Sequence, residues 1–366
     1  MKSVRIRHSF YLLLATLFWG TTFVAQSVAM DSLEPYTYNV CRFLVGFAVL
    51  LPLGIWSGHR DPHAVNYKNH TKESAAQRRR SLLLGGIACG ICIFLSGSLQ
   101  QIGLVYTTAG KSGFLTAMYI LLVPVFGLFL RRRCPATVWI ASAIAVVGLY
   151  FLCITENVSI NKGDVITLFS AAVFAVHILV VDRVSPEVNG VQLSALQFLI
   201  GGLVSIIPML LFESPSWASV IHAWGPILYA GIFSCGVAYT LQIIGQRDLN
   251  PTVASLLMSL ESCIAVLSSW LILGDTMSGR ELLGCVLMFC AIILAQLPER
   301  KKASDGTDRR KGIRPAETVG AAEQSLLRFV WILTQQNTIY VLYVCRLYLL
   351  LFSVRKRPNQ IINLLF

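Results

Sequence analysis

The sequence predicts an all-α membrane protein with ten transmembrane helices, arranged as two inverted repeats of five helices each. Hydrophobic residues make up 55% and charged residues 13% of the 366 residues, and the mean hydropathy is +0.66. A soluble domain carries about 25% charged residues, so this chain has too few polar side chains to cover a globule in water. Long apolar segments recur along the chain, each able to cross about 30 Å of hydrocarbon as a helix.

Helices are the expected spanning form because lipid offers the backbone no hydrogen-bond partner. Turn residues such as Pro35, Pro135, Gly190 and Pro251 stand where apolar segments begin. We expect ten spans, at 10–29, 36–56, 82–101, 112–130, 136–154, 164–181, 191–211, 222–244, 252–273 and 282–297.

The apolar segments repeat within the chain. RFLVGFAVLLPL begins at Arg42, and QFLIGGLVSIIP begins at Gln197, 155 positions later. LQQIGLVYTTAG begins at Leu99, and LQIIGQRDLNPT begins at Leu241, 142 positions later. Such internal similarity indicates duplication of one unit. Because five is an odd number of spans, the second copy enters the membrane from the opposite side, which makes the repeats inverted.

Lysine and arginine are unevenly divided between alternate loops. With the N-terminus in the cytoplasm, the outer loops carry only Lys111, Lys162 and Arg280, and the inner segments carry most of the rest. The positive-inside rule therefore supports ten spans and a cytoplasmic N-terminus. The net charge of +12 is thus an orientation signal, and we do not expect nucleic-acid binding. The basic start and apolar run also fit a cleaved signal peptide, but a run of about 20 residues favours a retained first span.

The sequence contains no pattern typical of an enzyme or of a metal site. Cys89 and Cys92 have the CxxC spacing, but they lie within a predicted span and are expected to be packing residues. The histidines of loop 57–80 could in principle bind a metal, but Pro62 interrupts helical spacing there and favours a solvated loop. P-loop, GxSxG and HExxH motifs are absent. We therefore expect no catalytic residues, no cofactor and no metal.

Two full charges lie inside predicted spans, Arg42 in the second and Glu261 in the ninth. A charge near mid-helix costs about 2.5–3.5 kcal/mol on insertion scales, so neither residue should face lipid. In one interpretation the two residues hold helices together. In the other, Glu261 binds a substrate ammonium group or a coupling proton.

Repeat alignment relates other polar positions to one another. His177 corresponds to Thr22 at the 155-residue offset, and Tyr119 corresponds to Glu261 at the 142-residue offset. Inverted-repeat transporters bind substrate between their repeats, near the middle of the membrane. His177 could relay protons there, or it could be a neutral side chain hydrogen-bonded within the bundle. Both interpretations are kept.

Three segments resemble the EamA-like drug/metabolite transporter family: FWGTTFVAQ from Phe18, PYTYNVCRF from Pro35, and SLLMSLESCIAVLSSWLILGDTMSGRELLGCVLM from Ser255. The resemblance covers about residues 10–298. Glu261 stands at the Glu of the family's second-repeat pattern, and Gly274 at its Gly.

The chain departs from the family pattern at three places. Ser262 replaces a proline, Asp275 replaces a glutamate, and the arginines at 131–133 replace the Leu-Gly-Glu of the first repeat. These departures leave the implied fold and transport class in place and weaken any inference about the substrate.

The resemblance implies ten helices in two inverted repeats around a central cavity. It also implies secondary active export or exchange of small metabolites, often amino acids, by alternating access without ATP. The cell inner membrane is the expected location. Within that scheme the expected substrate-binding residues are Trp19, Thr22, Gln101, Tyr119, His177, Gln242 and Glu261.

The expected domains are a first repeat at 1–156, a second repeat at 157–298 and an atypical tail at 299–366, a cytoplasmic linker followed by an interfacial segment. Expected partners are the lipid bilayer, a small-molecule substrate and, as one option, a coupling proton; nothing in the sequence specifies an oligomer. Two alternatives stay open. One is a nucleotide-sugar or organic-phosphate exchanger of the same architecture, and the other is a membrane scaffold that transports nothing.

Overall fold

The structure is a computed structural model that describes residues 2–59, 72–107, 109–131, 134–153, 161–247, 249–268 and 278–296. The chain divides into two compact units, Met1–Trp56 with Asn69–Arg309 and Ser57–Lys68 with Arg310–Phe366. Only residues 57–59, the end of one helix, are described in the second unit, so the account below concerns the first. The predicted tail at 299–366 lies outside the described residues.

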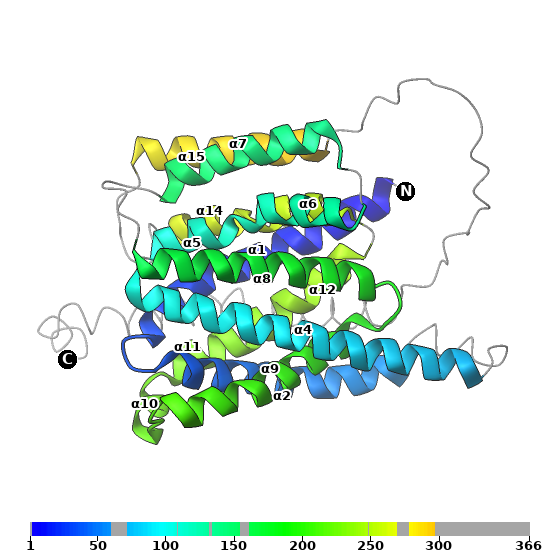
Figure 1. The fold of residues 1–366 in the computed structure, drawn as a ribbon, viewed down its shortest axis with the longest axis vertical. Helices are drawn as coiled ribbons and strands as arrows, with labels where there is room; N and C mark the ends of the chain where they lie inside the picture. Colours follow the sequence, from blue (N-terminus) through cyan, green and yellow to red (C-terminus); the bar gives the residue numbers. More distant parts are fainter. Residues whose placement is uncertain are drawn as a thin grey trace, which may run out of the picture. The chain divides into compact units, whose positions relative to one another are not determined.

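All regular structure in the described residues is helical, and η2 is a π-helix. The elements are α1 Lys2–Ala29, α2 Pro35–His59, α4 Lys72–Tyr106, α5 Ala109–Ala117, α6 Tyr119–Phe129, α7 Ala136–Cys153, α8 Lys162–Val184, α9 Gly190–Phe212, α10 Trp217–His222, α11 Trp224–Tyr229, η2 Ala230–Ala238, α12 Tyr239–Gln246, α13 Pro251–Met258, α14 Leu260–Ser268 and α15 Gly279–Gln296 (Figure 1).

Within the described residues, eight helical segments are long and apolar enough to cross a membrane. They are Ile6–Ala29, Pro35–Gly58, Ala76–Tyr106, Ser112–Phe129, Lys162–Val184, Gly190–Phe212, Trp224–Gln246 and Pro251–Ser268. The helix at Ala136–Leu152 is apolar but shorter, and α15 is not among the eight. Helical structure thus lies at each of the ten predicted positions, and the chain is a multi-pass membrane protein. The number of ten spans stays a prediction.

Asparagine side chains start three helices of the second half. Asn161 accepts a hydrogen bond from the Asp164 amide at 3.0 Å, and the Asp164 carboxylate accepts one in return from the Asn161 amide at 3.0 Å. The Asn189 side chain caps α9 by accepting from the amides of Val191 and Gln192. Asn250 caps α13 directly before Pro251. Each cap satisfies amides that a helix start leaves free, which is why these helices begin where they do.

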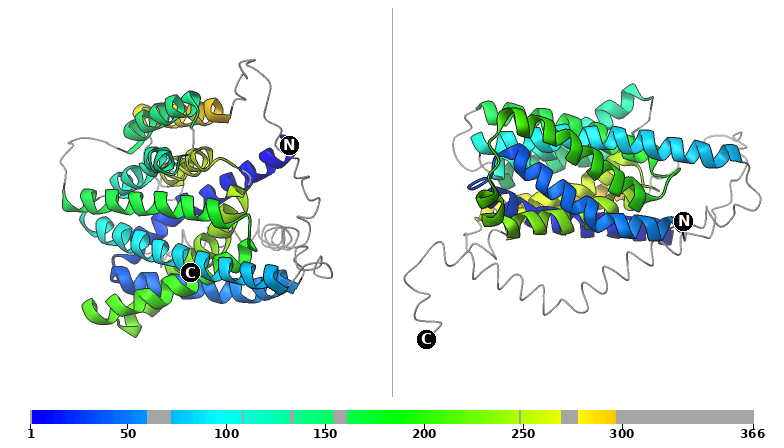
Figure 2. Two further views of the ribbon diagram at one scale, coloured as in Figure 1. Left: turned by 45° about the vertical axis from the view of Figure 1, so that its right-hand side comes forward. Right: turned by 90° about the horizontal axis from the view of Figure 1, so that it is seen from below.

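The helices pack in pairs that join distant parts of the sequence. Helix α4 lies along α8 and α9, α7 lies along α15, and α1 packs against η2, α12, α13 and α14 (Figures 1 and 2). Helix α4 has 35 residues and extends beyond the predicted span at 82–101. Each of these pairs joins a helix from the predicted first repeat to one from the predicted second repeat.

Glycines allow the closest of these approaches. A Cβ atom added to Gly148 of α7 would lie 2.9 Å from the Gly284 carbonyl oxygen of α15, and one added to Gly284 would lie 2.6 Å from the Gly148 carbonyl oxygen. Only a residue without a side chain fits at these two positions. A Cβ atom added to Gly90 of α4 would likewise lie 2.9 Å from the Gln197 carbonyl oxygen of α9. Small residues that bring backbones together are the usual basis of helix packing in lipid.

Two glutamates tie the start of α2 to the end of α9. The Glu213 carboxylate accepts hydrogen bonds from the amides of Tyr36 and Thr37, both at 2.6 Å. In return, Glu34 accepts one from the Ser214 amide at 3.0 Å. A carboxylate at a helix N-terminus is stabilised both by the free amides and by the helix dipole. This end of the α2–α9 pair is therefore held by polar contacts.

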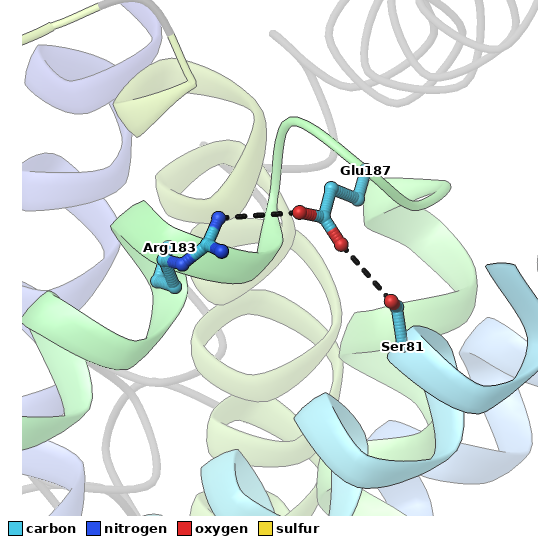
Figure 3. Close-up of polar contacts among 3 residues, drawn as sticks. All are labelled: Ser81, Arg183 and Glu187. Carbon is cyan, nitrogen blue, oxygen red and sulfur yellow. Dashed lines mark hydrogen bonds and ion pairs between the residues drawn. The ribbon is translucent and has the colours of Figure 1, made fainter. Parts of the chain in front are cut away.

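At the other end of α9, a second polar cluster holds the turn between α8 and α9. Glu187 accepts a hydrogen bond from Ser81 of α4 at 2.9 Å and pairs with Arg183 at 3.2 Å (Figure 3). Arg247 donates to the Ser185 carbonyl at 3.0 Å. The Arg183 side chain is 75% exposed, and such surface pairs contribute about 0–1 kcal/mol. The cluster therefore positions the turn and adds little stability.

Replacing Gly284 with valine tests the α7–α15 contact. The added side chain meets backbone atoms that cannot move aside, so we expect a loss of about 1–3 kcal/mol and a lower melting temperature in detergent. Gly113→Ala is the control, because a Cβ atom there meets nothing within 4 Å. We expect that variant to gain about 0.4–1 kcal/mol. Equal melting of Gly284→Val and wild type would disprove the close contact.

Candidate functional site

A cavity, partly open to solvent, lies within the helical bundle. Its walls combine aromatic and apolar side chains with a few polar groups, which is typical of small-molecule sites. The lining residues are Trp19, Thr22, Phe23, Gln26, Arg42, Gln100, Thr116, Tyr119, Phe174, Ile178, Ser234, Tyr239, Gln242, Met258 and Glu261.

Most of the residues predicted for substrate binding meet at this cavity. Trp19 and Thr22 reach it from α1, Tyr119 from α6, Gln242 from α12 and Glu261 from α14. These five positions are spread over more than two hundred residues of sequence, and the fold brings them to one place.

Gln101 and His177 do not line the cavity in this conformation. Both side chains are fully buried. The amide atoms of Gln101 have no hydrogen-bond partner among the described residues. His177 Nε2 lies 3.1 Å from Gln197 Oε1, and its ring contacts Tyr239, which does line the cavity. His177 is therefore one side chain removed from the cavity. The roles predicted for both residues stay predictions.

Glu261 and Tyr119 are in direct contact. The Tyr119 hydroxyl donates a hydrogen bond to Glu261 Oε1 at 3.1 Å, and both side chains are buried. These are the two positions that the 142-residue repeat offset relates. A contact between repeat-related residues is expected where an axis of pseudo-symmetry passes between them.

Both residues stand just after a tightened turn in a helix. Helix α5 ends at Ala117 and α6 begins at Tyr119; α13 ends at Met258 and α14 begins at Leu260. Three-residue bonds form at each turn, as from the Ser262 amide to the Ser259 carbonyl at 3.2 Å, but a four-residue bond also runs from the Ser259 amide to the Ser255 carbonyl at 3.0 Å. Each pair of elements therefore forms one continuous helical segment, at Ser112–Phe129 and Pro251–Ser268. Short three-residue turns within a helix often mark functional positions.

Arg42 is the second charge at the cavity. Its side chain is 5% exposed, and its guanidinium carbon lies 5.1 Å from the centre of the Tyr38 ring and 4.9 Å from that of the Phe43 ring. Arg42 Nε has no hydrogen-bond partner among the described residues, and no carboxylate among them forms an ion pair with Arg42. Arg42 and Glu261 thus border one cavity without pairing with each other.

The sequence did not single out Tyr239, which is central to the aromatic wall. Its ring packs edge-on against Trp19, with the ring centres 4.9 Å apart, and against Phe198 at 5.3 Å. Tyr239 directly follows the π-helix η2, which contributes Ser234 to the cavity. π-helical turns occur frequently at functional sites. No charge in the sequence marks this segment.

The repeat offsets also relate other lining residues to one another. Gln100 corresponds to Gln242 at the 142-residue offset, and Phe23 corresponds to Ile178 at the 155-residue offset. All four line the cavity. In the described part of the chain, no group of three or more His, Cys, Asp or Glu residues could hold a metal ion. The predicted Gly274–Asp275 motif and residues 60–71 of the predicted loop 57–80 lie outside the described residues, while 57–59 and 72–80 are helical.

Comparison with known proteins agrees with this architecture. The model of the EamA-like transporter family matches residues 7–154 and, a second time, residues 161–297. An uncharacterized transporter from Archaeoglobus fulgidus is 27% identical over 293 residues, which is 78% of this chain and 84% of that protein. The threonine/homoserine exporter RhtA from Salmonella typhimurium is 27% identical over 176 residues, which is 46% of this chain and 56% of that protein.

A protein of known crystal structure shares the fold, with a TM-score of 0.63 and 19% identity over 79% of this chain and 96% of that one. The family match over most of the sequence identifies the class of protein. The chain belongs to the EamA-like transporter family and is a membrane transporter, not an enzyme.

Proposed function

We propose that the protein is a secondary active transporter that exports or exchanges small metabolites, amino acids among them, by alternating access across the inner membrane. The observation that carries this proposal is the cavity itself, which Arg42 and Glu261 border without pairing. The name of one relative, a threonine/homoserine exporter, agrees with an amino-acid substrate.

The proposed architecture is ten transmembrane helices in two inverted repeats, at 1–156 and 157–298, with the N-terminus in the cytoplasm. The tail at 299–366 is proposed to lie outside the transport unit, as a cytoplasmic linker and an interfacial segment. The two matches to one family model support the repeats.

A hydrogen bond that recurs at equivalent positions gives further support to two copies of one unit. Asn39 Nδ2 donates to Ser98 Oγ at 3.3 Å. The residues at the corresponding offsets are Ser194 and Thr240, and the Thr240 hydroxyl donates to Ser194 Oγ at 2.9 Å. The first bond joins the predicted second and third spans, and the second bond joins the predicted seventh and eighth spans.

The two charges assign the poles of the substrate. A guanidinium group binds a carboxylate in two parallel hydrogen bonds, and a carboxylate binds an ammonium group. A buried charge that lacks a partner is costly, so a substrate of opposite charge is stabilised at each pole. A small zwitterion such as an amino acid satisfies both poles, with its side chain against the aromatic wall of Trp19 and Tyr239. Thr22 and Gln242 are proposed to fix its orientation, and Gln101 and His177 to act in another conformation.

Competition for Glu261 is the proposed basis of coupling. A carboxylate can hold either a proton or a substrate ammonium group, and Tyr119 donates a hydrogen bond that orients the group for both. Because the proton and the ammonium group cannot occupy this site together, binding of one requires release of the other, which gives exchange. Proton coupling of this kind needs no cofactor and no ATP.

The alternatives have less support. Exchange of a nucleotide sugar or an organic phosphate calls for several cations around the phosphate, and Arg42 is the single Lys or Arg among the lining residues. A scaffold that transports nothing has no use for a buried cavity with two unpaired charges, which lower the stability of the bundle.

Replacing Glu261 with glutamine tests the ammonium pole. We expect exchange of radiolabelled amino acids, threonine included, to fall at least about tenfold in proteoliposomes, because losing one partner of a buried charge pair costs about 2–5 kcal/mol. The dependence on a pH gradient should disappear as well. Glu187→Gln, which changes an exposed carboxylate, is the matched control and should exchange normally. Exchange at the wild-type rate in Glu261→Gln would remove this carboxylate from the mechanism.

Replacing Arg42 with glutamine tests the carboxylate pole. Wild type should be inhibited more strongly by an amino acid than by the same amino acid with its carboxylate converted to an amide. We expect Arg42→Gln to lose that preference and Arg42→Lys to retain part of it. Lysine keeps the positive charge but cannot form the two parallel hydrogen bonds of a guanidinium group. Competition of unlabelled compounds against labelled exchange measures the preference. An unchanged preference in Arg42→Gln contradicts the assignment.

Labelling from outside intact cells tests the inverted repeats. Asp31 and Glu187 lie just before α2 and α9, which occupy equivalent positions in the two proposed repeats, and both residues are exposed. A membrane-impermeant maleimide should react with Asp31→Cys and should reach Glu187→Cys only after the cells are opened. The unsubstituted chain controls for its native cysteines. Reaction of both variants from the same side would rule out the inversion.

A further inference from the structure

Beyond the cavity, toward the end of the bundle where α12 ends and α13 begins, the helices close on one another. Helices α1, α12 and α13 each pack against the other two. Thr16 and Ser255 lie one helical turn from the lining residues Trp19 and Met258 in this direction, and both are fully buried. We call this contact among the three helices the closed interface.

Gln246 lies in the closed interface. It follows Gln242 by four residues in α12, so it is on the same helix face and one turn farther from the cavity. Its neighbour Gly245 packs directly on α1, since a Cβ atom added there would lie 3.0 Å from the His8 carbonyl oxygen and from Leu12 Cδ2. The Gln246 side chain is 0% exposed.

The amide of Gln246 is unsatisfied in this arrangement. Neither its nitrogen nor its oxygen has a hydrogen-bond partner among the described residues. Buried polar groups in proteins are nearly always hydrogen-bonded, and one that is not destabilises the arrangement that buries it. A bound water can supply the missing partners, and so can a second arrangement of the helices in which the amide is exposed.

We propose that Gln246 lines the half of the transport path that is closed in this conformation, and that this half opens between α1, α12 and α13. When the closed interface separates, water or the polar part of the substrate binds the amide. Thr16, Ser255 and Gly245 are small, so separation exposes a passage in continuity with the cavity. This inference rests on the proposed function, because it concerns the second state of alternating access.

The proposal predicts whether replacing Gln246 stabilises or destabilises the closed interface. The unpaired amide raises the free energy of the closed interface relative to the open one. A methionine side chain is similar in length to glutamine and has no amide that needs a hydrogen bond. It therefore stabilises the closed state and makes opening rarer. A glutamine with a purely structural role predicts the reverse, because its replacement removes stabilising hydrogen bonds.

The test compares wild type with Gln246→Met, using the full chain in lipid nanodiscs. We expect Gln246→Met to raise the melting temperature. Hydrogen–deuterium exchange in peptides covering residues 8–16 and 243–258 should slow about tenfold. Removing the penalty of one unpaired amide lowers the population of the open state by about this factor. The rate of amino-acid exchange in proteoliposomes should fall by a similar factor, with little change in KM.

Ser142→Ala is the matched control. The Ser142 hydroxyl is also buried and unpaired among the described residues, but it lies on α7, which lines no part of the cavity. We expect its removal to leave hydrogen–deuterium exchange at the closed interface unchanged. A slowing as large as in Gln246→Met overturns the assignment of the effect to Gln246.

A lower melting temperature of Gln246→Met, or unchanged hydrogen–deuterium exchange at the closed interface, overturns the proposal. Gln246→Leu is the second variant and must give the same sign; if neither variant folds, the amide is structural and the proposal is wrong. The melting temperature and the hydrogen–deuterium exchange need no substrate, so a failure of the Glu261 and Arg42 predictions leaves these two measurements in place. Conversely, if Glu261→Gln loses amino-acid exchange but substitution of Gln246 has no effect, this inference alone is overturned.

Discussion

The inability of lipid to solvate polar groups is the constraint on which the whole structure depends. It forces the described backbone into helices and turns polar side chains toward the interior of the bundle. Side chains such as Phe129, Leu211 and Trp217 are exposed, whereas Thr240 and Gln197 are fully buried. Because polarity is concentrated inside, the interior is also the only place where a polar substrate can be bound within the membrane.

The proposed function would use this constraint for selectivity. Charges near the middle of a membrane cost about 2.5–3.5 kcal/mol each, and Arg42 and Glu261 would relieve part of that cost by pairing. They border the same cavity and remain separate. Under the proposed function, a molecule that carries both complementary charges therefore gains from each residue. A molecule with one charge would leave the other residue without a partner.

Composition and repeats predicted the helical membrane class, the positions of the helices and several of the polar lining residues, because a polar or charged side chain that faces lipid is costly. The rest of the cavity wall was harder to predict. Met118 and Ser259 keep helical backbone angles at the two tightened turns, and no glycine or proline marks either position. Tyr239 reaches the cavity through the packing of α12 against distant helices. Sequence periodicity does not report which face of a fully apolar helix turns inward.

The two tightened turns lie directly before the contact that joins the two halves of the chain. Short three-residue turns within a helix often mark functional positions. Tyr119 and Glu261 follow these turns and are hydrogen-bonded to each other. Under the proposed function, a cation that binds Glu261 alters this contact between one helix of each half. Occupancy of the site would then change the packing of the two halves through this pair of residues, which is the kind of linkage that alternating access requires.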